Sequence, residues 1–276
     1  MDLLSLTDKV KVILAKSGIT DLSESEFLVS LACGVARNQT RMNIPVSKTK
    51  AKKAIRWANM RASGVPLTII TKSANFYGRE LFVNSNCLAP RPETEELVCW
   101  VGNNANHEAK VLDLCTGSGA IAITLFLEFG FNHISAADIS DKALAVARKN
   151  AKNLGCEIKF IKSNLFAKIK DKFDVIVSNP PYVAERDYLN LENEVKNYEP
   201  KIALVGGADG LEFYRQIISS APNYLNVGGK IFFEVGIKEA KTVKKLLEKN
   251  FENIIIKKDI EGIERMVMGT LKENLC

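Results

Sequence analysis

Two consecutive prolines directly follow an apolar segment, in the run Asn179-Pro180-Pro181-Tyr182. Each proline fixes its own φ angle and lacks a backbone N–H, so the carbonyl oxygen of Pro180 is left as a rigid acceptor without a competing local amide. The side-chain oxygen of Asn179 provides a second acceptor next to it. Two converging acceptors fit a planar NH2 group, because each can hold one of its hydrogens.

Holding an NH2 group in this way would favour attack by its nitrogen. The lone pair of an amide or aryl amine is delocalised, and accepting both N–H bonds raises the electron density on nitrogen and fixes its orientation. A methyl group on a positively charged sulfur is a suitable electrophile, and its transfer relies mainly on positioning and electrostatic preorganisation. We therefore interpret Asn179 and Pro180 as catalytic, and Asn179, Pro180, Pro181 and Tyr182 as substrate-binding. Tyr182 is expected to pack against the flat group or the cation.

An earlier glycine-containing loop predicts a nucleoside cofactor. Gly117 and Gly119 permit a tight turn and a close approach to a ligand, and the spacing Gly117-x-Gly119-x-x-Ala122 also fits a dinucleotide fingerprint. Asp138 follows 19 residues after Gly119 and can accept both ribose hydroxyls of either NAD or S-adenosylmethionine. The loop does not distinguish the two cofactors. The predicted cofactor-binding residues are Cys115, Thr116, Gly117, Ser118, Gly119, Asp138, Asn164, Leu165 and Asn179, with Asn164 and Leu165 against the adenine.

The segments around these residues alternate between strand and helix patterns. Strand patterns cover 111–114, 134–138, 158–161, 173–178 and 230–235, and helix patterns cover 120–129, 141–154, 211–225 and 239–249. This alternation predicts an α/β fold with right-handed crossovers and a mostly parallel sheet covered by helices on both faces. Ligands of such sheets bind at the carboxyl ends of the strands, where the candidate residues lie.

A small helical domain is predicted over residues 1–75, because apolar residues there recur at helical spacing. In its second helix Ser23 and Glu26 fit a capping box, and Ser47 can cap the third. A short strand pair within a linker, 76–89, follows, and residues 90–276 form the catalytic domain.

Charge is distributed unevenly between these parts. Residues 1–89 hold 13 Lys and Arg against 6 Asp and Glu, a net charge of +7, whereas residues 90–276 have a net charge of −1. The asymmetry indicates either a negatively charged partner for the first domain or simply a solvated lysine-rich helix face.

Metal chemistry and membrane insertion are not expected. The chain has 6 cysteines and 2 histidines but no C-x-x-C pair, so we expect no metal site and no disulfide framework, and reduced, mostly buried thiols. No apolar run approaches the roughly 20 residues needed to span a bilayer. The first residues do not follow a signal-peptide pattern, so a cytoplasmic location is expected.

Several motifs together resemble the release-factor glutamine methyltransferases, also called the PrmC or HemK family. The resemblance runs over nearly the whole chain. It rests on Gly64-Val65-Pro66-Leu67, Pro90-Arg91-Pro92-Glu93-Thr94-Glu95, the loop 113–119, Asn179-Pro180-Pro181-Tyr182, the segment 199–211, Glu234-Val235-Gly236 and Gly262-Ile263-Glu264-Arg265. In the family an aspartate usually stands where this chain has Asn164.

This resemblance implies a class I S-adenosylmethionine-dependent methyltransferase: a Rossmann-like, mostly parallel seven-stranded sheet with an antiparallel last strand over 265–269, and a small N-terminal helical domain. It implies S-adenosyl-L-methionine as cofactor, with S-adenosyl-L-homocysteine as product. The acceptor would be the side-chain amide nitrogen of the glutamine in the Gly-Gly-Gln motif of class 1 peptide chain release factors. The helical domain would dock that partner, which makes the basic face of residues 37–61 a candidate contact.

Three alternatives remain open from the residues alone. The Asn179–Tyr182 run equally suits the exocyclic amine of adenine, as in a nucleic-acid amino-methyltransferase, although no target-recognition insertion is evident. A NAD-dependent oxidoreductase could use the same glycine loop, but it would need a hydride-transfer acid or base. A non-catalytic binding module would not need the intact Asn179–Tyr182 run.

Overall fold

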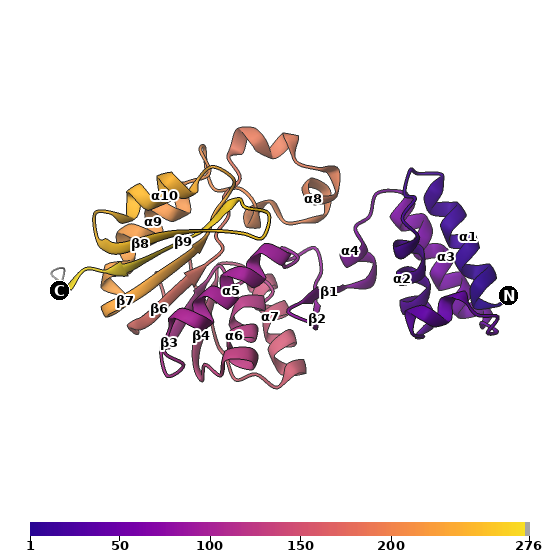
Figure 1. Ribbon diagram of the computed structural model, residues 1–276, viewed down its shortest axis with the longest axis horizontal. Coiled ribbons are helices and arrows are strands. Elements are labelled where there is room, and N and C mark those ends of the chain that lie inside the picture. The colour runs from indigo at the N-terminus through magenta and orange to yellow at the C-terminus, as the bar shows by residue number, and fades with distance from the viewer. Residues whose placement is uncertain (274–276) are drawn as a thin grey trace. The chain divides into compact units, whose positions relative to one another are not determined.

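The computed structural model describes residues 1–273, which form two compact units that divide between Lys72 and Ser73 (Figure 1). The first unit contains α1 (Leu3–Ala15), α2 (Leu22–Cys33), the short 3-10 helix η1 (Arg37–Arg41), α3 (Lys48–Ala62) and α4 (Leu67–Thr71). Leucines of α1 pack against α2 and against the small side chains of Ala51, Ala54 and Ala58 on α3. Alanine at these positions lets the helices approach closely.

Local capping explains where these helices begin. The hydroxyl of Ser47 accepts the backbone N–H of Lys50 and starts α3, as predicted. The predicted capping box of α2 is wrong: Asp21 is the N-cap and accepts the backbone N–H of Ser23 at 2.7 Å. Aspartate caps a helix as well as serine does. Glu26 is thereby left to accept a hydrogen bond from Arg41 at 2.6 Å.

A β-hairpin opens the second unit, with β1 (Ser73–Phe76) antiparallel to β2 (Arg79–Phe82). Tyr77 and Gly78 join the strands, and both have positive φ angles, of 51° and 73°. Two such residues in succession form the turn that matches the twist of a tight hairpin. The predicted strand pair is present, although β1 begins earlier in the chain than its pattern indicated.

The second unit is built on a seven-stranded sheet with the order β5-β4-β3-β6-β7-β9-β8 (Figure 1). Its strands are β3 (Lys110–Leu114), β4 (His133–Asp138), β5 (Lys159–Lys162), β6 (Phe173–Ser178), β7 (Leu225–Glu234), β8 (Phe251–Lys258) and β9 (Glu264–Leu271). Neighbours from β5 to β7 are parallel, and β9 is antiparallel to both β7 and β8. The predicted class I methyltransferase fold is confirmed.

Helices cover both faces of this sheet. They are α5 (Pro92–Asn104), α6 (Ala120–Phe129), α7 (Asp141–Leu154), α8 (Asn193–Tyr198), α9 (Glu212–Ser220) and α10 (Ala240–Leu247), with the 3-10 helices η2 (Glu185–Asn190), η3 (Lys201–Ala203) and η4 (Ala221–Asn223). The α9 helix is shorter than its pattern predicted and passes into η4 at Pro222, which lacks the N–H that a continuing helix needs. The motif Pro90–Glu95 runs into a helix, because Pro92 is the first residue of α5.

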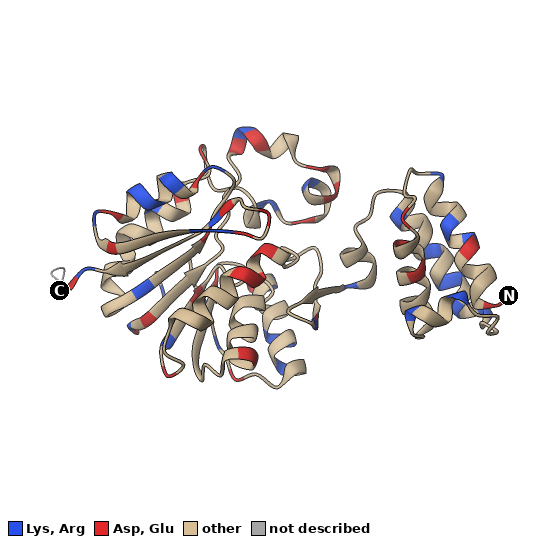
Figure 2. Ribbon diagram, in the orientation of Figure 1, with Lys and Arg blue, Asp and Glu red and all other residues tan. Residues whose placement is uncertain are grey.

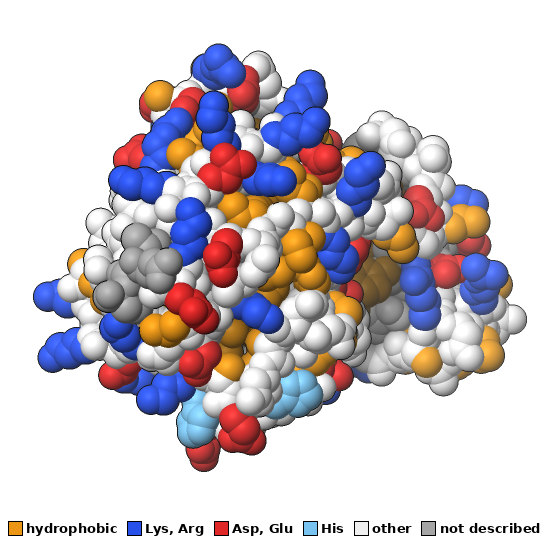
Figure 3. Space-filling model, turned by 60° about the vertical axis from the view of Figure 1, so that its left-hand side comes forward, with side chains coloured by type: hydrophobic (Ala, Val, Ile, Leu, Met, Phe, Trp, Pro, Cys, Tyr) orange, Lys and Arg blue, Asp and Glu red, His pale blue; other side chains and the backbone are white. Residues whose placement is uncertain are grey.

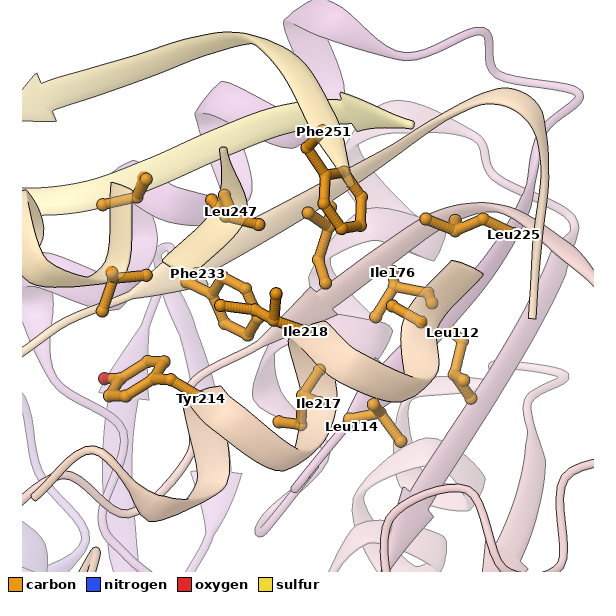
Figure 4. Close-up of a cluster of buried hydrophobic side chains, with 14 of the residues drawn as sticks. Leu112, Leu114, Ile176, Tyr214, Ile217, Ile218, Leu225, Phe233, Leu247 and Phe251 are labelled. Carbon is orange, nitrogen blue, oxygen red and sulfur yellow. The ribbon is translucent and has the colours of Figure 1, made fainter. Parts of the chain in front are cut away.

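Side chains alternate between two hydrophobic clusters along the central strands. Leu112, Leu114 and Ile176 lie in the cluster that includes α9 and α10, whereas Val111 and Val175 lie in the one that includes α5 and α6. Figure 4 shows Tyr214, Ile217 and Ile218 of α9 in the first cluster, with the strand residues around them. Burial on both faces anchors the strands whose carboxyl ends bear the candidate residues.

Thiols and surface charge complete the description of the chain. Five cysteines are free: Cys33 and Cys87 are buried and Cys99, Cys115 and Cys156 are partly exposed, so burial is less complete than predicted; Cys276 lies outside the described residues. None of the helices within residues 1–273 is long and apolar enough to cross a membrane. On the face seen in Figure 3, acidic and basic side chains are interspersed, in keeping with the near-zero net charge of residues 90–276.

Asn150 of α7 joins the hairpin to the glycine loop. Its side-chain oxygen accepts the backbone N–H of Phe82 at 2.8 Å, and its NH2 group donates to the carbonyls of Phe82 (2.9 Å) and Ser118 (3.0 Å). The residue is 2% exposed. One amide therefore satisfies three backbone groups from two segments that are distant in sequence.

Asn150→Ala should lower the free energy of unfolding by about 1–3 kcal/mol, because buried backbone groups lose their partners. Urea unfolding of the full chain measures this loss. The matched control is Asn103→Ala, whose amide bonds only within its own helix at an exposed site; we expect a change within about 0.5 kcal/mol there. Equal losses in the two variants would contradict the role of Asn150.

Candidate active site

A cavity of about 300 Å³ opens at the carboxyl ends of β3, β4 and β6. This volume is at the lower end of the range found for small-molecule sites, roughly 300–1,000 Å³. Of the predicted site residues, seven line the cavity: Cys115, Gly117, Asp138, Asn164, Leu165, Asn179 and Pro181. Thr116, Ser118, Gly119, Pro180 and Tyr182 lie next to these residues in the chain but are not part of the cavity wall.

The glycine loop after β3 is held from beneath by Asp113. This carboxylate is fully buried, and its Oδ2 accepts the Thr116 hydroxyl at 2.6 Å and the backbone N–H of Ala122 at 3.3 Å. Gly119 has a φ of 82°, and a Cβ there would come within 3.1 Å of Ala147. Thr116 and Gly119 thus fix the conformation of the loop and do not line the cavity. Cys115 and Gly117 are the loop residues that line it.

Asp138 at the end of β4 bridges the loop and the cavity. Its Oδ2 accepts the backbone N–H of Gly117 at 2.9 Å, and its Oδ1 accepts that of Ser140 at 2.8 Å. Burial raises the pKa of this carboxyl, and the two backbone hydrogen bonds lower it. Each oxygen keeps a second lone pair, so the carboxylate can still accept the hydroxyls of a ribose.

Apolar side chains flank this carboxylate. Ile139 and Leu165 line the cavity, and Leu165 has a positive φ of 45°. Asn164 lies beside Leu165 in the same wall. A cavity wall that combines these aliphatic side chains with an amide can hold a flat heterocyclic base.

Part of the cavity wall was not predicted from the sequence. It consists of Asn86, Cys87 and Leu88 after the hairpin, Ile139, Ser140, Ala143 and Ser163, Pro200, Ile202 and Ala203, and Glu212, Phe213 and Gln216 of α9, together with Leu114 and Ala137. The segment 199–203 is fixed by an ion pair in which Arg91 donates to both carboxylate oxygens of Glu199, at 2.7 and 2.8 Å. Family motifs drew attention to this segment but did not place it over the cavity.

At the end of β6, Asn179 is oriented by α5 and β7. Its side-chain NH2 donates to the hydroxyl of Thr94 at 3.3 Å, and that hydroxyl donates to Oε2 of Glu234 at 2.6 Å. Within residues 1–273, no group donates a hydrogen bond to Oδ1 of Asn179 or to the carbonyl oxygen of Pro180. Both acceptors therefore remain available to a ligand.

Tyr182 and its surroundings are enclosed. Burial, with a smaller contribution from the charge of Glu234, raises the pKa of Tyr182 to about 12, so its phenol stays neutral. A Cβ on Gly236 would come within 3.1 Å of the Tyr182 ring, and one on Gly206 within 2.4 Å of the Pro181 carbonyl oxygen. Glycine at both positions lets neighbouring segments pack directly against this run.

Buried carboxyls beside the site retain their protons to unusually high pH. Burial raises the pKa of Glu234 to about 7, against the lowering effects of its bond with Thr94 and the charge of Arg265. Burial likewise raises the pKa of Asp113 to about 7. Among residues 1–273, no cluster of three or more His, Cys, Asp or Glu side chains could hold a metal ion.

Comparison with known proteins agrees with this arrangement. A family model, the methyltransferase small domain, matches residues 94–195. The release factor glutamine methyltransferase of Bacillus cereus is 38% identical over 91% of this chain and 93% of its own length. That of Bacillus subtilis is 36% identical over 91% of each protein.

Solved structures share the fold at low sequence identity. A methyltransferase from Pyrococcus furiosus has a TM-score of 0.55 and 20% identity, covering 71% of this chain and 90% of that one. The hMettl16 catalytic domain, solved with the MAT2A 3'UTR hairpin 6, has a TM-score of 0.57 and 19% identity, covering 84% of this chain and 86% of that one.

Sheet order, cavity position and the methyltransferase small domain together define an enzyme of the class I methyltransferase type. Given the identity and coverage of its curated relatives, the chain belongs to the release factor glutamine methyltransferase family.

Asp113→Asn should flatten the dependence of stability on pH. Folded Asp113 titrates at about 7 instead of its ordinary 3.8. The folded state thus holds this proton to higher pH, and the free energy of unfolding falls as pH rises from about 4 to about 7. Without this titrating group, the fall in the free energy of unfolding between pH 5 and pH 8 should be smaller by on the order of 2–3 kcal/mol.

Urea unfolding at the two pH values measures the effect. Asp187→Asn, at an exposed aspartate, is the control and should keep the wild-type slope. If Asp113→Asn also kept that slope, the raised pKa would be refuted.

Proposed function

We propose that this enzyme transfers the methyl group of S-adenosyl-L-methionine to the side-chain amide nitrogen of the glutamine in the Gly-Gly-Gln motif of class 1 peptide chain release factors. One observation carries the proposal: Oδ1 of Asn179 and the carbonyl of Pro180 are adjacent acceptors that no group of residues 1–273 occupies. Asn179 also lines the cavity that fits a nucleoside. The names of the relatives support the same substrate.

The cavity residues fit the proposed cofactor. Asp138 would accept the ribose hydroxyls, and Ile139 and Leu165 would enclose the adenine, with Asn164 at its edge. When bound, S-adenosyl-L-methionine supplies a methyl group on a positively charged sulfur and leaves as S-adenosyl-L-homocysteine.

The protein's contribution is to orient and activate the nitrogen. Asn179 and Pro180 each accept one N–H of the glutamine amide, which fixes the plane of the group and leaves a face of the nitrogen open toward the methyl carbon. Pro180 is buried and its ring cannot donate, so its carbonyl has no local competitor. Preorganised acceptors need no rearrangement during transfer. Pro181 and Tyr182 would enclose the substrate amide.

The other function classes receive less support. A NAD-dependent oxidoreductase would need an acid or base near the cofactor, and no histidine lies among the described cavity residues. A nucleic-acid amino-methyltransferase would share the acceptor pair but not the family. Label transfer from the cofactor to a release factor or to nucleic acid distinguishes the two.

The Asn179→Ala variant should retain most of its affinity for S-adenosyl-L-methionine, because Asp138, Ile139 and Leu165 still line the cavity, but should lose most methylation of a release factor. An unpaired N–H in an enclosed site costs about 1–3 kcal/mol, or roughly 5- to 150-fold in rate. The measurement is transfer of labelled methyl from the cofactor, with calorimetry for cofactor binding.

Asn190→Ala, at an exposed asparagine, is the control and should transfer label at the wild-type rate. A release factor that lacks the glutamine should take up no label. Wild-type turnover by Asn179→Ala, or labelling of nucleic acid instead of the release factor, would refute the proposal.

The helical domain predicted over residues 1–75 is proposed to dock the release factor through its basic face. Several arginines of residues 37–61 already have acidic partners: Arg37 and Arg41 pair with Glu26, and Arg61 with Glu24. Lys48, Lys52 and Arg56 are instead exposed at intervals of four residues on α3. Figure 2 marks the Lys and Arg positions along the ribbon in blue. Residues at this spacing share one helix face, so these three form a basic stripe.

Reversing this basic stripe with Lys48→Glu, Lys52→Glu and Arg56→Glu should weaken release-factor binding by about tenfold or more and flatten its salt dependence, because exposed charges act through screened attraction. Binding titrations at low and high salt measure both effects. The control reverses Lys241, Lys245 and Lys249, which are also exposed, in the second unit. Equal affinities in the stripe variant and wild type would rule out this surface.

A further inference from the structure

Three side chains distant in sequence form a hydrogen-bond chain that ends at the candidate substrate site. Glu234, at the end of β7, accepts from the hydroxyl of Thr94, in the first turn of α5, at 2.6 Å. The same hydroxyl accepts from the NH2 of Asn179 at 3.3 Å. Thr94 is 4% exposed and Glu234 3%, so water does not replace these partners.

The number of hydrogens in this chain decides how the Asn179 amide is turned. A threonine hydroxyl has one hydrogen and two lone pairs. Above about pH 7 Glu234 is ionised and can only accept, so the threonine hydrogen goes to Glu234 and the hydroxyl can only accept from Asn179. The amide must then present its NH2 to Thr94 and its oxygen away from Thr94. The reverse orientation would set two oxygens against each other with no hydrogen between them.

We propose that Thr94 and Glu234 are positioning residues that hold the Asn179 amide with its oxygen outward, and that this orientation selects a carboxamide over the isosteric carboxylate. The inference rests on the proposed function, because it concerns how the same acceptor pair recognises a glutamine. Neither residue is assigned a contact with the substrate.

Selectivity follows from the chemistry of the pair. Two outward acceptors attract the NH2 of glutamine and repel the oxygens of glutamate, which differ from that NH2 little in size. If the Asn179 amide could rotate by 180°, it would present its NH2 group to the substrate instead of its oxygen. The NH2 group could then donate to a carboxylate. Loss of the Thr94 hydroxyl should therefore weaken discrimination as well as turnover.

Thr94→Val tests this directly, since valine keeps the shape of threonine but has no hydroxyl. The full chain is assayed with an intact release factor as substrate, and with the same factor carrying glutamate in place of the Gly-Gly-Gln glutamine as competitor. We expect kcat to fall about tenfold, equivalent to about 1.4 kcal/mol of transition-state stabilisation. The preference for the glutamine form should fall by a similar factor, while the dissociation constant of S-adenosyl-L-methionine stays within about twofold.

Two comparisons separate positioning from general stability. Thr94→Ser retains a hydroxyl and should restore most of the discrimination. Thr124→Val alters another buried helical threonine and controls for such a change elsewhere in the unit. Should the valine variant not fold, Thr94→Ala removes the same hydroxyl without adding a methyl group.

The outcomes are distinguishable. The positioning role would be overturned if Thr94→Val preferred the glutamine form as strongly as the wild type, or if the valine and serine variants lost this preference equally. In either case, methylation of the release factor by the wild type would still uphold the proposed function. Failure of the wild type to methylate the intact release factor would overturn both, because the selectivity is defined for that substrate.

Discussion

The two prolines after β6 impose the constraint on which the site depends. Pro180 and Pro181 have no backbone N–H, so they cannot donate to neighbouring carbonyl groups where the chain leaves the sheet. Those carbonyl groups must find hydrogen-bond donors elsewhere. Its neighbours pack against this backbone through glycines: a Cβ at Gly206 would come within 2.4 Å of the Pro181 carbonyl oxygen, and one at Gly210 within 2.3 Å of that of Tyr182. Gly206 and Gly210 are thus explained by close packing against the backbone that follows the acceptors, whereas Gly207, with a φ of 86°, lies against Glu212.

Connections from other parts of the chain keep this edge of the sheet in place. The first turn of α5 contributes Thr94, which contacts Asn179 directly after β6 and Glu234 at the end of β7. The preceding Arg91 forms an ion pair with Glu199. The motif Pro90–Glu95 therefore acts on both the polar chain behind Asn179 and the segment that borders the cavity. Pro92 is suited to the first position of α5, because the N–H that proline lacks would have no hydrogen-bond partner within the helix there. The same few residues therefore start α5 and hold Asn179 and Glu199 in place.

Much of this architecture could be predicted from sequence because its signals are local. The helices α6 and α7 begin and end at the predicted residues, since glycine follows each last turn. Residues after several strands could be grouped in one site because parallel strands end at one edge. By contrast, β8 was missed: its apolar residues do not alternate, and its pairing with β9 shifts register. The roles of Thr94 and of the wall from Pro200 to Ala203 depend on contacts across 85 or more residues, which spacing does not encode.

Buried acids around the site show how stability and function are balanced. Glu234 accepts from Thr94, Asp113 from Thr116, and Glu239 from the backbone N–H of Gly236, so each carboxyl organises a segment next to the cavity. Burial raises the pKa of all three to about 7, which means that ionising them in place is unfavourable. An apolar substitute would avoid that penalty but leave buried donors without acceptors. The arrangement is best explained by the orientation it imposes, because polar networks of this kind specify geometry even where they add little stability.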